Sequence, residues 1–116
     1  MNTFHQFQIL LQNNGIPLDD LGLREVALKR NDALAAVDLL RKASRSISGG
    51  DVYFKHGNKI EIAYANWHSD PKADENPEQF MQRSCFETKD YIEKFPDSES
   101  LPLFVLVSYN KSRNSL

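Results

Sequence analysis

The chain is poor in the features that mark secreted and membrane proteins. Its 116 residues contain one cysteine, Cys85, so no disulfide can form within the chain, which suits a reducing compartment. Residues 1–11 have neither a basic region nor a small-residue cleavage site and do not resemble a signal peptide. No apolar run approaches the roughly 18 residues that cross a bilayer. We therefore expect a cytoplasmic protein that does not enter a membrane.

Glycine and proline are also scarce, at five residues each, which argues against a low-complexity chain. Hydrophobic residues make up 41% and charged residues 26%, values typical of a globular rather than a disordered protein. A chain of this length is usually one domain and can bury a core without disulfides. The sequence thus predicts a single domain over residues 1–116, with its core over about 3–109 and a flexible tail over 110–116.

Three segments have apolar residues at steps of three and four, the spacing of an amphipathic helix. They cover residues 3–12, about 31–45 and 77–95. Asn76-Pro77 is a helix start signal, because it places a capping side chain directly before a proline at the first helical position.

The ends of the first two helices are predicted from the same kind of signal. Thr3 is expected to cap the first helix, and Asn14-Gly15 to end it with a left-handed residue. Asn31 or Asp32 is expected to cap the second helix. The run 48–50 (Ser-Gly-Gly) is expected to end that helix and turn the chain, and its glycine pair to allow close backbone passage.

The remaining signals predict strands. Residues 51–67 fit a β-hairpin with turn chemistry around Gly57. In its second strand large apolar residues alternate with small or polar ones, so that one face is apolar: Ile60, Ile62 and Tyr64 against Glu61, Ala63 and Ala65. Residues 102–109 contain consecutive apolar positions and predict a strand covered on both faces. Within 18–30, residues 25–29 fit a strand at a sheet edge, or a helix.

These elements together predict an α+β fold. Helices and strands are segregated along the chain, and no βαβ alternation demands a parallel sheet. We expect a small, mainly antiparallel or mixed sheet with about three helices packed on it.

No residues have the spacing of a catalytic or metal-binding motif. His56 and His68 flank one hairpin strand, and an extended strand rises about 3.4 Å per residue, which places them tens of ångströms apart. Cys85 falls on the apolar stripe of a predicted helix, which indicates a buried and unreactive thiol. The sequence therefore predicts no catalytic residues, no metal and no cofactor.

Charge is distributed unevenly along the chain. The net charge is −2, but residues 70–99 contain nine acidic and four basic side chains, so this stretch is −5 and the remainder +3. Phosphates would be repelled by such a surface, which argues against nucleic-acid binding there and favours a basic partner. The alternative interpretation is a solvated helix face with no partner.

Trp67 is the only tryptophan and ends the second hairpin strand. Such a residue either anchors the end of the core or lies exposed as a binding hot spot, because tryptophan is enriched in both places. The sequence leaves both interpretations open.

Three short stretches resemble one known family. They are Ser48-Gly49-Gly50-Asp51-Val52-Tyr53, Ala65-Asn66-Trp67 and the helix from Phe80 to Tyr91. Together they resemble the immunity protein 40 family of bacterial polymorphic toxin systems, over about residues 20–109. The resemblance implies a small, cytoplasmic, non-enzymatic protein that binds and neutralises a cognate toxin domain of the same cell. Many such toxins are nucleases with basic clefts, which an acidic surface would attract.

The expected contact surface combines the acidic segment with the tryptophan. Its residues are Trp67, Asp70, Asp74, Glu75, Glu78, Glu87, Asp90 and Glu93. Two other functions remain open. One is a small-ligand-binding or enzymatic domain with a pocket between sheet and helices, which would need convergent polar groups. The other is a structural subunit of a larger assembly.

Overall fold

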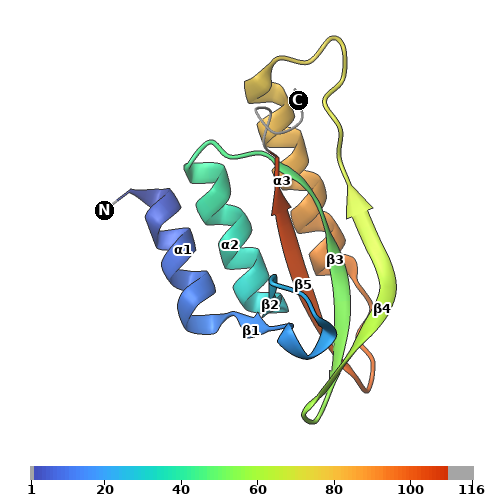
Figure 1. Ribbon diagram of the computed structural model, residues 1–116. Helices are drawn as coiled ribbons and strands as arrows, with labels where there is room; N and C mark the ends of the chain where they lie inside the picture. Colours follow the sequence, from blue (N-terminus) through green and yellow to red (C-terminus); the bar gives the residue numbers. More distant parts are fainter. Residues whose placement is uncertain (1, 110–116) are drawn as a thin grey trace.

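The computed structural model describes residues 2–109, and in this range helices pack on a single antiparallel sheet (Figure 1). The helices are α1 (Thr3–Asn14), α2 (Arg30–Lys42) and α3 (Pro77–Lys94), with a short 3-10 helix η1 (Asp19–Leu21). The strands are β1 (Ile16–Pro17), β2 (Val26–Lys29), β3 (Ile47–His56), β4 (Lys59–His68) and β5 (Leu101–Ser108). The strand order is β1-β2-β5-β3-β4, and all neighbours are antiparallel. The predicted α+β class is confirmed.

The main core lies between the sheet and the helices. In Figure 1 the three helices stand side by side along the sheet, with α1 on the outside against α2. Phe104 of β5 and Val52 of β3 are buried beneath Leu40 of α2 and Ile92 of α3. Each such side chain contributes about 1.5–3 kcal/mol by leaving water.

A smaller cluster covers part of the opposite face. Leu103 and Val105 point away from Phe104 and pack with Leu18 and Tyr53. Because β5 lies inside the sheet and is covered on both sides, its sequence has the apolar character that predicted this strand.

The ambiguous stretch 18–30 contains η1 and then β2. The strand expected at 25–29 is confirmed, since Leu28 pairs with Phe104 of β5. Its outer side is not open, because Ala27 pairs with Ile16 of the short strand β1.

Strand β4 keeps the predicted alternation of large and small side chains, but its small residues, and not its large apolar ones, face the helices. The small residues Ala63 and Ala65 pack toward the helices, whereas Ile62 and Tyr64 are 51% and 89% exposed on the other side. The register passes from Tyr53–Ile62 to Val52–Ala65, so β4 bulges by two residues between these pairs. Tyr64, in the bulge, has the left-handed backbone angle φ 56°.

Several predicted helix ends are wrong. The side chain of Asn2, not Thr3, caps α1, and Gly15 has an ordinary extended conformation with φ −66°. Helix α2 begins directly after β2, so neither Asn31 nor Asp32 lies at its N-cap, and no side chain caps it. By contrast, the start of α3 is confirmed, with a reciprocal capping box between Asn76 and Gln79.

The glycine pair does not end α2. That helix stops at Lys42, and Ser44, with φ 58°, lies in the connection that follows. Gly49 and Gly50 lie inside β3, where other chain segments approach the backbone too closely for a side chain.

The predicted tail, residues 110–116, lies outside the described residues. Among the residues that the structure describes, no helix has the length and apolarity needed to cross a membrane.

Candidate functional site

The glycine pair and the tryptophan, distant in sequence, meet across the β3–β4 hairpin. Gly50 pairs with Trp67, and Asp51 pairs with Asn66. A Cβ atom on Gly50 would lie 2.4 Å from Cη2 of Trp67 and 2.1 Å from the carbonyl oxygen of Val105. The glycine therefore makes room for the indole on the helix-facing side of the sheet.

Trp67 connects the end of β4 to α3. Its Nε1–H donates a hydrogen bond to Oγ1 of Thr88 at 3.0 Å. Its ring stacks on Tyr91, with 4.7 Å between the centroids, and meets the edge of Phe104. Trp67 is partly buried against the main core, so the structure supports its interpretation as a core anchor.

Arg83 of α3 fixes the loop between β4 and α3. Its Nε and Nη2 donate to the two carboxylate oxygens of Glu75 at 2.6 and 2.8 Å, and Nη2 also donates to the carbonyl of Asp70. Nη1 donates to Oε1 of Glu87 at 2.9 Å. The hydrogen bonds that Arg83 donates to Glu75 lower the pKa of the Glu75 carboxyl to about 2. Hydrogen bonding to Glu75 in turn raises the pKa of Arg83.

The predicted acidic residues do not form one uniform patch. Those that are exposed are Asp70, Asp74, Glu78, Glu87 and Glu93, although the side chain of Glu87 is 44% exposed. The side chain of Glu75 is only 10% exposed and is occupied by Arg83, so it holds the loop rather than offering free charge. Asp90 is half-buried and pairs with Lys94 at 2.8 Å.

Three of the predicted residues come together at one place. Trp67, Glu87 and Asp90 line an open hollow of about 280 Å³ between the end of β4 and α3, here called the β4–α3 hollow. Asp74 and Glu75 line a separate hollow on the loop. Neither of these two hollows includes Glu93.

Sequence reasoning missed four residues that line the β4–α3 hollow, namely His68, Ser69, Phe86 and Tyr91. Tyr91 stacks on Trp67, and Phe86 is 69% exposed on α3. Phe86 lies off the apolar stripe of its helix, and an aromatic residue on the polar face was the signal that could have revealed it. Arg83 was also missed, because its role depends on a loop that only the fold brings close.

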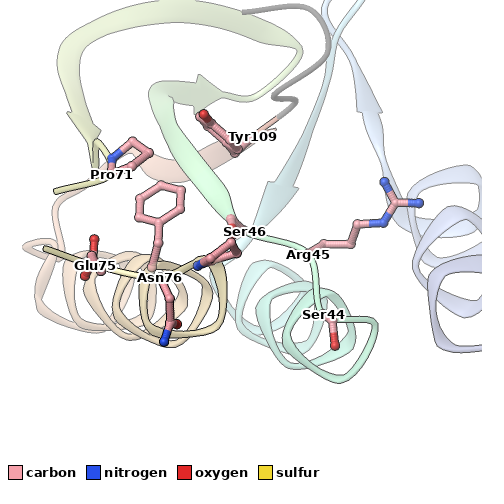
Figure 2. Close-up of a pocket in the computed structure, with 9 residues that line it drawn as sticks. Ser44, Arg45, Ser46, Pro71, Glu75, Asn76 and Tyr109 are labelled. Carbon is pink, nitrogen blue, oxygen red and sulfur yellow. The ribbon is translucent and has the colours of Figure 1, made fainter. Parts of the chain in front are cut away.

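A further recess, of about 420 Å³, lies at the N-terminus of α3 and not between sheet and helices (Figure 2). Phe80, Pro71 and Tyr109 form apolar parts of its wall. Figure 2 shows Arg45 pointing away from this recess, and its guanidinium lies 4.1 Å from the ring centroid of Phe4. The carboxylate that lines the recess is that of Glu75, already paired with Arg83.

The residues with potential metal or redox chemistry are dispersed. Within residues 2–109, no three His, Cys, Asp or Glu side chains are grouped to hold a metal ion. His56 lies 3.6 Å from Glu61, and His68 lies 3.7 Å from Asp70, at different places on the surface. Cys85 is 1% exposed, and burial raises its pKa to about 11, which confirms the predicted buried thiol.

Comparison with known protein families gives a match over most of the chain. A protein-family model described as immunity protein 40 matches residues 17–108, which include the sheet from Pro17 onward together with α2 and α3. Comparison with curated proteins and comparison with solved structures each found no match. Helix α1 lies outside the matched range.

Proposed function

The chain belongs to the immunity protein 40 family, and from this we propose that it binds a cognate bacterial toxin domain and neutralises it. The observation that carries the proposal is the extent of the family match. Residues 17–108 include the Gly50–Trp67 pair, the Arg83 cluster and the β4–α3 hollow. These three features therefore all lie in the part of the chain that the family model matches.

The proposed mechanism is surface complementarity without bond-making. The loop after β4 and the outer side of α3 present carboxylates to solvent, among them Asp70, Asp74 and Glu78. A basic surface on the toxin, such as a nuclease cleft, would be steered toward them and held by charge pairing. Covering such a cleft would exclude its nucleic-acid substrate.

The individual residues are proposed to have different roles. Asp70, Asp74, Glu78, Glu87 and Glu93 would attract the toxin from the surface. Glu75 would act indirectly, because its ion pair with Arg83 sets the shape of the loop. Trp67 and Asp90 would contribute at the β4–α3 hollow. The proposal involves no catalytic residue, metal or cofactor.

The test is co-expression with a toxin-like protein encoded directly beside this gene. We expect the chain to restore growth of cells that produce the toxin domain, and to co-purify with it as a defined complex. The toxin domain of an unrelated locus is the control, and it should be neither bound nor neutralised. A stable toxin that shows no binding by calorimetry and no growth rescue would refute the proposal.

A further inference from the structure

The β4–α3 hollow combines aromatic surface with carboxylates in a way that the fold itself does not require. Phe86 is 69% exposed and stands beside Glu87 on α3, so its ring stabilises little of the core. Tyr91 and Trp67 form the inner part of the hollow, where their rings stack. An exposed aromatic residue next to a partly buried aromatic pair is typical of a binding surface.

The carboxylate of Glu87 is held in position at the rim. Its Oε1 accepts hydrogen bonds from Oγ of Ser69 at 2.7 Å and from Nη1 of Arg83 at 2.9 Å. Both bonds end on the same oxygen, so within the described part of the chain Oε2 accepts none. The positive charge of Arg83 is already matched by its bidentate pair with Glu75. Glu87 thus keeps an oriented, negatively charged oxygen for a partner.

Asp90 provides a second carboxylate one helical turn away. Its Oδ1 pairs with Nζ of Lys94 at 2.8 Å; the two side chains are 44% and 76% exposed, and ion pairs with this much solvent contact are weak. Residues three positions apart lie on neighbouring parts of a helix surface, so Asp90 and Glu87 can contact the same group.

These features fit one kind of side chain. Guanidinium is weakly hydrated, stacks on aromatic rings and makes two parallel hydrogen bonds to a carboxylate. We propose that the β4–α3 hollow receives an arginine side chain of the partner protein, with the cation against Phe86 and Tyr91 and its N–H groups on Glu87 and Asp90. The identification of the partner as a toxin domain rests on the proposed function. The preference of the hollow for arginine does not depend on it.

The arginine preference can be tested without any toxin. The isotope-labelled protein is titrated with N-acetyl-arginine amide and, separately, with the citrulline analogue, which has nearly the same shape but no charge. We expect NMR shifts at the Trp67 indole N–H and the Phe86 and Glu87 amides with arginine, and much smaller shifts with citrulline. Equal shifts for both probes, or none at these positions, would overturn the inference.

A double variant shows whether the two carboxylates are responsible. Glu87→Gln with Asp90→Asn keeps hydrogen-bond acceptors while removing charge, and should abolish the difference between arginine and citrulline. The matched control, Asp19→Asn with Asp20→Asn, removes the same charge from exposed positions in η1, outside the hollow. If the control loses the arginine response as fully as the double variant, the hollow is not the site.

Toxin binding then separates this inference from the proposed function. With a toxin domain that binds the unaltered chain, Phe86→Ala and the Glu87/Asp90 variant should each weaken affinity about tenfold or more. Unchanged affinity would overturn the arginine site and leave the proposed function standing. If no toxin binds the unaltered chain, the proposed function fails. The titration with the arginine and citrulline probes then tests by itself whether the hollow binds arginine.

Discussion

The indole of Trp67 occupies the space above Gly50, its partner across the β3–β4 ladder. A side chain on Gly50 would meet Cη2 of the ring at 2.4 Å and the Val105 carbonyl oxygen at 2.1 Å. The indole also donates to Thr88 and stacks on Tyr91, so Trp67 links the β3–β4 hairpin to α3.

Gly50→Ala should destabilise the protein strongly. Because the Val105 carbonyl belongs to the neighbouring strand and cannot move alone, we expect a loss of about 3 kcal/mol in the free energy of unfolding. Gly22→Ala is the control: a methyl group there would have no atom within 4 Å, and φ is 74°. Its cost should be about 1–2 kcal/mol from the left-handed backbone alone. Urea unfolding measures both, and a larger loss for Gly22 would contradict the close approach.

Stability should depend on pH through Glu75. Arg83 lowers the pKa of this carboxyl from its ordinary value of 4.5 to about 2, so the folded state favours the ionised form. The stabilisation is complete above about pH 4.5 and is lost as the pH falls toward 2. Glu75→Gln should therefore be less stable than the unaltered chain near neutral pH, with the difference shrinking across this window.

Arg83→Gln is the companion variant for that experiment. It removes the partner instead of the carboxyl, and its stability deficit should shrink over the same pH range. Urea midpoints measured at intervals from pH 7 to pH 2 would show this. A deficit that stays constant with pH for both variants would mean that the ion pair does not stabilise the fold.

Tyr64→Gly should not destabilise the protein, although it removes a large side chain. Tyr64 is 89% exposed and has φ 56°, a conformation that costs a non-glycine residue about 1–2 kcal/mol. Glycine relieves that cost and loses little packing. Tyr53→Gly, at a buried position on the neighbouring strand, is the contrast and should lower the thermal midpoint clearly. A marked loss for Tyr64→Gly would indicate that its side chain stabilises the bulge.

Charge reversal on the loop tests the proposed steering of a basic toxin. Asp74→Lys with Glu78→Lys should slow association and flatten its dependence on salt, while leaving Glu75 in place preserves the loop. Asp19→Lys with Asp20→Lys makes the same charge change in η1, at the opposite end of the molecule in Figure 1. Stopped-flow association rates should fall more for the loop variant. Equal rates would remove Asp74 and Glu78 from the interface.

Cys85 should react slowly in the folded protein. Its thiol is buried, and burial raises its pKa to about 11, so little thiolate is present at neutral pH. Labelling with a disulfide reagent at pH 8 should be slow under native conditions and fast in denaturant. Rapid native labelling would show that this part of α3 opens readily.

The sequence by itself determined the elements whose signals are local. The spacing of apolar residues fixed three helices, because neighbouring turns of one helix decide which side chains share a face. Asn76-Pro77 predicted the start of α3, where the structure has the Asn76–Gln79 capping box. Such a cap is a local signal because it involves only residues three positions apart. The consecutive apolar run at 103–107 predicted the interior strand β5, because a strand buried on both sides needs no polar face.

Tertiary structure alone decided the features that depend on distant partners. Ala63 and Ala65 of β4 face the helices, whereas Ile62 does not, because the side of the sheet that the helices cover is decided by tertiary packing and not by the alternation pattern. The glycine pair predicted close backbone passage, but only the fold shows that the group packed against Gly50 is the indole of Trp67. Arg83 donates hydrogen bonds to Glu75, Glu87 and the Asp70 carbonyl. It can reach Glu75 and Asp70 only because the loop folds back against α3. Periodicity encodes contacts within an element, whereas a binding surface is made of contacts between elements, and these exist only after the chain has folded.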